Sequence, residues 1–136
     1  MPDGIRILRA CLITIESHAG ENPAVECCGL LAGRDGTIER AMPALNAAGN
    51  PATAYEIAPE NIFRMLREIR AERLELLGIY HSHPRSENVP SPRDLELAGY
   101  PDTAYFIFSP AVPREKSLRA FSIRDGRAAE LAIEIV

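Results

Sequence analysis

One stretch that carries two histidines and an aspartate limits what this chain can fold into more than any other part of it. The apolar residues 76–80 lead into His81-Ser82-His83, and a proline-rich loop separates these histidines from Asp94. Because side chains alternate from side to side along an extended chain, His81 and His83 point the same way and can share one ion. Two histidines and an aspartate are ligands that leave the fourth position of a tetrahedral zinc ion open to water. The spacing therefore predicts a catalytic metal site rather than a structural one.

A second motif lies upstream, at residues 26–29 (Glu-Cys-Cys-Gly). Together with residues 81–84 (His-Ser-His-Pro), Ser91 and Asp94, it resembles the signature of the JAMM (MPN+) zinc metallopeptidases. Both halves of the signature occur in the order and at the distances of that family. The segment from residue 99 to residue 118 has no room for a large second insertion, so the chain is similar to the compact prokaryotic members.

The resemblance implies a ligand set and two catalytic roles. His81, His83 and Asp94 would hold one Zn²⁺ per chain. A zinc hydrolase also needs a carboxylate that is not a ligand, to take a proton from the attacking water, and Glu26 is predicted to be that base. Glu26 precedes an apolar strand, where partial burial would raise its pKa towards neutrality. The Ser91 hydroxyl would donate to the oxyanion as charge builds on it.

Each of these residues also has an interpretation that needs no metal. Ser91 and Asp94 fit the start of a helix, with a serine cap, a proline at the first helical position and an acid facing the helix dipole. Glu26 fits an exposed acid at a strand edge, and a His-x-His pair fits a strand end at the surface. Glu87 and Asn88, in the loop between His83 and Asp94, are candidates for contact with substrate. The joint occurrence of the motifs favours the metal site.

Cysteine content and net charge limit the compartment and the partners that we expect for the protein. Three cysteines are an odd number, and the neighbours Cys27 and Cys28 are badly placed to pair with each other, so we expect free thiols in a reducing compartment. Both are predicted to pack as small hydrophobes rather than to bind zinc. A net charge of −4, with Lys116 the only lysine, offers no basic footprint for nucleic acid. No signal peptide or membrane span is recognisable, so a cytoplasmic protein is expected.

The length of 136 residues suits one domain, residues 1–136, with a single core. Apolar periodicity predicts helices over residues 8–19, 59–73 and 92–98, although β-branched residues in the first of these favour a strand. Strands are predicted over residues 5–9, 27–32, 37–45, 53–57, 74–80, 104–109, 118–123 and 129–135, with hairpin turns at residues 33–36 and at Asp125-Gly126. The fold class is α/β, a central mixed or mostly antiparallel sheet flanked by helices. The resemblance implies the same MPN/JAB fold, similar to that of cytidine deaminases.

The resemblance also implies a substrate. Family members cleave peptide or isopeptide bonds at the C-terminal Gly-Gly end of ubiquitin-like proteins, and compact prokaryotic members act on sulfur carriers. We therefore expect a peptidase whose partner is a ubiquitin-like or sulfur-carrier protein, with its extended tail beside the site; a homodimer stays open. The alternatives are a zinc amidohydrolase on small molecules and a non-catalytic MPN-type scaffold, which would have lost a ligand. A zinc deaminase is less favoured because its Pro-Cys-x-x-Cys segment is absent.

Overall fold

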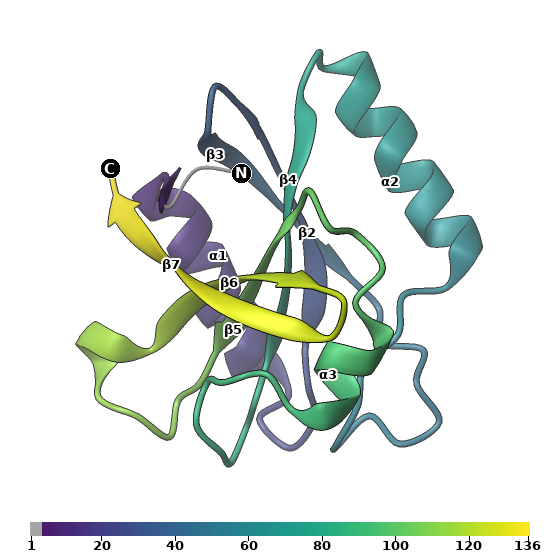
Figure 1. The fold of residues 1–136 in the computed structure, drawn as a ribbon. Helices are drawn as coiled ribbons and strands as arrows, with labels where there is room; N and C mark the ends of the chain where they lie inside the picture. Colours follow the sequence, from purple (N-terminus) through teal and green to yellow (C-terminus); the bar gives the residue numbers. More distant parts are fainter. Residues whose placement is uncertain (1–3) are drawn as a thin grey trace.

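The sheet of this protein closes on itself in the strand order β1-β3-β2-β4-β5-β6-β7, and helices pack against it (Figure 1). The computed structural model describes residues 4–136. Its elements, in chain order, are β1 (Gly4–Ile7), α1 (Arg9–Glu21), β2 (Cys28–Arg34), β3 (Thr37–Ala44), α2 (Pro59–Ala71), β4 (Glu75–Ser82), α3 (Pro92–Leu97), β5 (Ala104–Phe108), the 3-10 turn Arg114–Lys116, β6 (Leu118–Arg124) and β7 (Arg127–Ile135). β4 and β5 pair in parallel, as β1 does with β3 and β7, while the other pairs are antiparallel.

Neighbouring residues of the central strands β2, β4 and β5 belong to two different apolar clusters. One cluster joins residues of α1 to one face of the sheet: Cys11, Ile15, Leu31, Tyr80 and Phe106. The other joins residues of α2 to the opposite face: Met65, Ile69, Leu30, Ile79 and Ile107. Because side chains alternate along a strand, α1 and α2 cover opposite faces. This double burial explains why these strands are continuous apolar runs in the sequence.

The mixed sheet with its helices confirms the predicted α/β fold class. Both predicted hairpin turns are present, with positive φ at Asp35 (53°) and Gly36 (72°) and at Asp125 (51°) and Gly126 (71°). Two consecutive residues of this kind make the two-residue turn whose twist matches a hairpin. Closure of the sheet, through parallel pairing of β1 with β7, was not predicted.

The predicted strand over residues 53–57 is wrong, since the structure has a loop there. The side chain of Asn46 satisfies the backbone groups that a neighbouring strand would have paired. Its Nδ2 donates to the Ala54 carbonyl oxygen at 2.9 Å, and its Oδ1 accepts the Glu56 amide at 3.1 Å. One asparagine therefore replaces a strand partner in this segment.

The first helix resolves a choice that the sequence pattern left open. This segment forms a helix rather than a strand, and α1 continues past the predicted end at residue 19, through Gly20 to Glu21. Cys11 and Ile15, one turn apart, are its buried residues, so packing against the sheet outweighs the β-branched preference.

Within the described residues, no helix is both long and apolar enough to cross a bilayer.

Candidate metal centre

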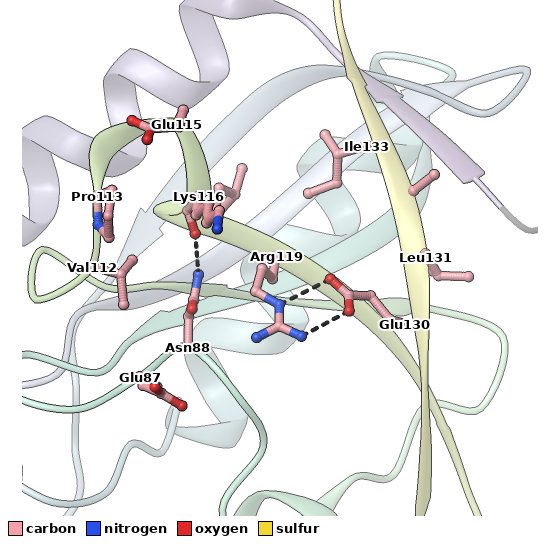
Figure 2. Close-up of a pocket in the computed structure, with 12 residues that line it drawn as sticks. Glu87, Asn88, Val112, Pro113, Glu115, Lys116, Arg119, Glu130, Leu131 and Ile133 are labelled. Atoms are coloured by element: carbon pink, nitrogen blue, oxygen red, sulfur yellow. Dashed lines mark hydrogen bonds and ion pairs between the residues drawn. The ribbon is translucent and has the colours of Figure 1, made fainter.

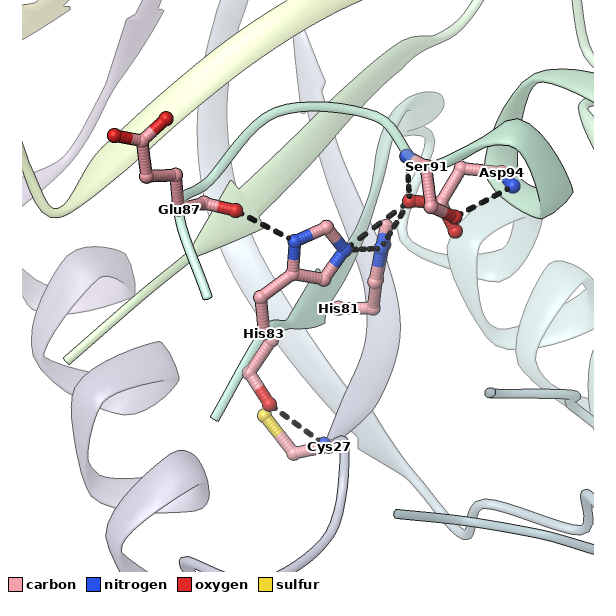
Figure 3. A network of polar contacts seen from close by, with 7 residues as sticks. Cys27, His81, His83, Glu87, Ser91 and Asp94 are labelled. Atoms are coloured by element: carbon pink, nitrogen blue, oxygen red, sulfur yellow. Dashed lines mark hydrogen bonds and ion pairs between the residues drawn. The ribbon is translucent and has the colours of Figure 1, made fainter. Parts of the chain in front are cut away.

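The end of β4 carries two histidines into the interior of the protein. β4 is paired on both sides, with His81 opposite Cys28 of β2 and opposite Ile107 of β5. Beyond the strand, the His83 amide donates to the Phe108 carbonyl oxygen at 2.9 Å. Both imidazoles are buried, and they approach the same point (Figure 3). Sheet pairing thus holds the two rings on one side, as their spacing in the sequence predicted.

A carboxylate reaches the same point from the first turn of α3. Ser91 is the N-cap residue, and its hydroxyl accepts the Asp94 amide at 3.1 Å. In return, Asp94 Oδ2 accepts the Ser91 amide at 2.9 Å, which completes a capping box. The same Oδ2 atom faces the histidines (Figure 3). The helix cap and the predicted ligand role are therefore compatible, because the cap orients the carboxylate.

Three atoms converge at this point with spacings that fit one metal ion. His81 Nε2 and His83 Nε2 lie 3.2 Å apart, and Asp94 Oδ2 lies 3.2 Å and 3.1 Å from them. Ligands of a tetrahedral zinc ion, each at about 2.0–2.2 Å, lie about 3.3 Å from one another. His83 Nδ1 lies 2.8 Å from the Glu87 carbonyl oxygen, which can only accept, so Nδ1 carries a proton, and Nε2 is the nitrogen that the neutral ring would offer to a metal ion. These three residues form a group whose side-chain atoms could together hold one metal ion.

Burial and hydrogen bonding give the three groups different charge preferences. Burial lowers the pKa of His81, which favours the neutral imidazole that a metal ion requires. Burial acts on His83 in the same direction, but hydrogen bonds to Asp94 and to the Glu87 carbonyl raise its pKa overall. Burial opposes ionisation of Asp94, yet hydrogen bonds from His81 and His83 hold its pKa well below the usual range. The carboxylate is therefore anionic, and a metal ion bound at this site would displace any proton held by His83 Nε2.

Glu26 lies just before β2, beside the ligand group but outside it. Its side chain is 7% exposed, and within residues 4–136 its Oε1 atom is buried without a hydrogen-bond partner. Burial raises the pKa of Glu26 to about 7, although the charge of His83 opposes the shift. Its backbone is anchored by its amide on Pro51 and by Asn46 Nδ2 on its carbonyl oxygen, at 2.8 Å and 3.0 Å. A fixed carboxyl group with a pKa near neutrality can both take up and release a proton.

The cysteines next to Glu26 pack in the core, as predicted. Cys27 belongs to the α1 cluster and Cys28 to the α2 cluster. Burial raises the pKa of both thiols, so they stay protonated at neutral pH. The hydroxyl of Ser82, which lies between the two histidines in sequence, accepts the Cys27 amide at 2.9 Å. This bond links β4 to the segment entering β2 and leaves the metal site to the imidazoles.

One residue that contacts the centre was missed by sequence analysis. The ring of Tyr55 stacks on His81, with centroids 4.4 Å apart and planes 20° apart. Tyr55 lies in the loop that replaces the predicted strand, so neither motif spacing nor periodicity could have revealed the contact. The third histidine, His18, is unrelated to the centre, since its Nδ1 atom lies 2.6 Å from the Tyr80 hydroxyl.

Glu87 and Asn88 shape the loop that carries the site. The Glu87 carbonyl orients His83, while its side chain points away from the histidines (Figure 3). Asn88 is buried and donates through Nδ2 to the Lys116 carbonyl oxygen at 2.7 Å (Figure 2). Both residues also line a cavity of about 650 Å³ beside the Arg119–Glu130 ion pair. That cavity, although large, contains none of the residues of the metal centre.

Comparison with known proteins gives this site a family context. The chain matches the family model described as prokaryotic homologs of the JAB domain over residues 9–124. A desampylase of Haloferax volcanii is 42% identical over 103 residues, which cover 71% of this chain and 74% of the relative. The CysO-cysteine peptidase of Mycobacterium tuberculosis is 33% identical over 135 residues, covering 97% and 92%. A probable TtuB-protein conjugate cleaving protease of Thermus thermophilus is 34% identical over 125 residues, covering 92% and 80%.

Solved structures share the fold. A protein from Desulfitobacterium hafniense superposes with a TM-score of 0.87 at 29% identity, covering 97% of this chain and 92% of that protein. A JAB1/MPN domain protein from Archaeoglobus fulgidus gives a TM-score of 0.63 at 22% identity, covering 95% and 98%. These likenesses confirm the MPN/JAB fold that the motifs implied.

Proposed function

This chain belongs to the family of prokaryotic homologs of the JAB domain, and we propose that it is a zinc peptidase acting at the Gly-Gly end of a ubiquitin-like or sulfur-carrier protein. The observation that carries the proposal is the convergence of His81, His83 and Asp94 on one point, beside the buried carboxyl group of Glu26. The names of the relatives, a desampylase, a CysO-cysteine peptidase and a conjugate-cleaving protease, support the bond type and the class of partner.

In this proposal, residues 1–136 act as one metallopeptidase domain in which each site residue has one task. His81 Nε2, His83 Nε2 and Asp94 Oδ2 hold one Zn²⁺ per chain. Zn²⁺, when bound, polarises the scissile carbonyl group and lowers the pKa of the attacking water. Glu26 takes the proton from that water and gives it to the leaving amine, a double task that suits its pKa of about 7.

Ser91 supports the developing charge on the substrate oxygen. Its Oγ atom accepts the Asp94 amide with a lone pair, so its own hydrogen stays free to donate. A preorganised donor of this kind stabilises the oxyanion as it forms. The capping box therefore keeps Ser91 and Asp94 in one rigid unit. A non-catalytic scaffold would need neither the free hydroxyl nor the buried Glu26.

The test is incubation of the zinc-loaded protein with a sulfur carrier that ends in Gly-Gly followed by a short extension, read by intact mass. We expect loss of the extension with cleavage directly after the second glycine, and elemental analysis should give about one zinc per chain. Glu26→Gln serves as the matched control, because it retains the ligand set. Bound zinc without cleavage of any carrier, but with cleavage of small amides, would favour the amidohydrolase alternative.

A further inference from the structure

Two pockets adjoin the metal centre, and they differ in the side chains that line them. The first, called here the small-residue pocket, has a volume of about 330 Å³, and its lining includes Ala24, Glu26, Ala52, His83, Arg85 and Ser91. The second, the tyrosine pocket, has a volume of about 300 Å³, and its lining includes Tyr55, Arg93, Asp94, Leu97, Tyr100 and Tyr105. One pocket contains a histidine of the ligand group and the other contains its aspartate. A substrate that spans the centre therefore occupies both.

The catalytic groups indicate which pocket receives which half of the substrate. Glu26, which must give a proton to the leaving amine, lines the small-residue pocket and not the tyrosine pocket. Ser91, the proposed oxyanion donor, lines the same pocket. A proton donor has to lie within hydrogen-bond reach of the atom that it protonates. The leaving group therefore enters the small-residue pocket, and the carrier tail reaches the centre from the tyrosine pocket.

Arg85 lines the small-residue pocket, and its positive charge has no role in the metal centre. It is exposed, and within the described part of the chain it forms no ion pair. Its backbone is nevertheless fixed, because the next residue, Ser86, accepts a 2.5 Å hydrogen bond from the buried Ser109 hydroxyl. On the other side, Pro84 joins it to His83. The backbone of Arg85 is thus anchored beside the centre, and its guanidinium group, which lines the pocket, is free to bind an anion.

We propose that Arg85 binds the free α-carboxylate of the leaving group, so that the preferred leaving group is a single amino acid rather than the lysine side chain of a conjugated protein. This inference rests on the proposed peptidase function. A C-terminal residue carries its carboxylate one carbon atom from the amine that leaves, whereas a conjugated lysine has no carboxylate near its side-chain amine. The size of the pocket fits a single amino acid, since its volume of about 330 Å³ lies at the small end of ligand pockets and its lining includes alanines.

The charge balance of the pocket supports the same assignment. Glu26 shares the pocket, and its carboxylate would repel a substrate carboxylate that had no cation beside it. In the reaction, water adds its hydroxyl group to the carbonyl carbon of the terminal glycine, and the C–N bond breaks. The amine takes one proton through Glu26, and the products are a carrier ending in glycine and a free amino acid. Arg85 contacts only the carboxylate, so it acts on specificity and takes no part in bond breaking.

The test compares two substrates that differ in one charge. A carrier ending in Gly-Gly-Ala is prepared with a free terminal carboxylate and with a terminal carboxamide, and each is given to the zinc-loaded enzyme. We expect KM to be about tenfold lower for the acid than for the amide, with similar kcat. Arg85→Gln should bring that ratio to about one, and Arg85→Lys should keep part of it. Arg93→Gln, an arginine of the tyrosine pocket, is the matched control and should keep the wild-type ratio.

Binding to metal-free protein separates this inference from the proposed function. If the wild-type enzyme cleaves neither substrate, the peptidase proposal fails, but the acid should still bind chelator-treated protein more tightly than the amide, by a margin that Arg85→Gln removes. An equal ratio in wild type and Arg85→Gln, in either assay, overturns the role of Arg85. If Arg93→Gln loses the difference between acid and amide as fully as Arg85→Gln does, the proposed role of Arg85 is also wrong, because the effect would then reflect any positive charge near the centre.

Discussion

The metal centre has two halves that are held in different ways. Its strand-held half consists of His81 and His83, at the end of β4, where backbone pairing runs on both sides, and of Glu26 just before β2, and all three side chains are buried. Its helix-held half consists of Ser91 and Asp94, at the start of a helix of 6 residues that has no buried residue. The first half derives its precision from the sheet, and the second derives it from one reciprocal capping box.

This difference indicates which half of the site is rigid and which half is sensitive to substitution. Shifting the histidines requires breaking strand pairs that belong to the core, whereas shifting Asp94 breaks the two hydrogen bonds of its cap and its contacts with the histidines, but no strand pair. We therefore expect changes in the strand-held half to act on chemistry with little rearrangement. Changes in the helix-held half should act on chemistry and local order together. The following predictions test this division.

The largest effect is expected for His83→Ala. The change removes one of the three proposed ligand atoms, His83 Nε2, which lies 3.1 Å from Asp94 Oδ2. Turnover should become undetectable, and added zinc should no longer raise the melting temperature, because stabilisation by a ligand depends on its binding to the folded state. Thermal shift with and without zinc measures this, and zinc stabilisation as large as in the wild type would remove His83 from the ligand set.

Glu26→Gln should reduce kcat by about 10²–10⁴-fold while zinc stays bound. The reason is that glutamine keeps the size of the buried side chain but cannot accept a proton. Elemental analysis of the variant should match the wild type, and single-turnover kinetics should locate the loss in the chemical step. Activity within a factor of a few of wild type would show that another group serves as base.

Ser91→Gly separates the two uses of the helix-held serine. Glycine is nearly as good as serine at the N-cap position and should cost only about a few tenths of a kcal/mol in stability. Loss of the hydroxyl as an oxyanion donor should nevertheless lower kcat by about 10²-fold. Chemical denaturation and steady-state kinetics measure the two effects. A fall in stability that matches the fall in activity would mean that Ser91 acts only as a cap.

The pH dependence of stability should report Glu26 in metal-free protein. Its folded-state pKa of about 7 is raised from 4.5, so the stabilisation that it confers is fully present below pH 4.5 and is lost as the pH rises through 7. The free energy of unfolding of wild type relative to Glu26→Gln should therefore fall between pH 4.5 and pH 8, by about 2–3 kcal/mol. Urea titrations of both proteins across this range measure it, and parallel curves would contradict the buried carboxyl.

The smallest effect is expected from the cap function of Asp94. In metal-free protein at pH 8, Asp94→Asn keeps an oxygen that can accept the Ser91 amide, so it should be more stable than Asp94→Ala, which loses that bond, by about 1 kcal/mol. Both variants should bind zinc weakly, since neither offers a carboxylate. If both bind zinc as the wild type does, the aspartate is a cap residue only.

Sequence analysis was most successful for features that depend on residues close together in the sequence. The side shared by His81 and His83, the start of α3 at Pro92 and the two hairpin turns each depend on neighbours within a few residues, and all are present in the structure. It failed at residues 53–57, where Asn46 supplies hydrogen bonds from outside the segment. It also missed Tyr55, whose contact with His81 depends on the path of that same loop.

The amino-acid sequence by itself determined the chemistry available at the site: the ligand types, the carboxyl group upstream, the hydroxyl group of the cap and the family signature that joins them. Only the tertiary structure decided that His81, His83 and Asp94 meet at spacings of 3.1–3.2 Å, that Glu26 is buried beside them, and that Arg85 lines the same pocket as Glu26. The physical reason is the separation in sequence between the residues that interact. Alternation and capping act between near neighbours, but distances and burial arise when β2, β4 and α3 pack together.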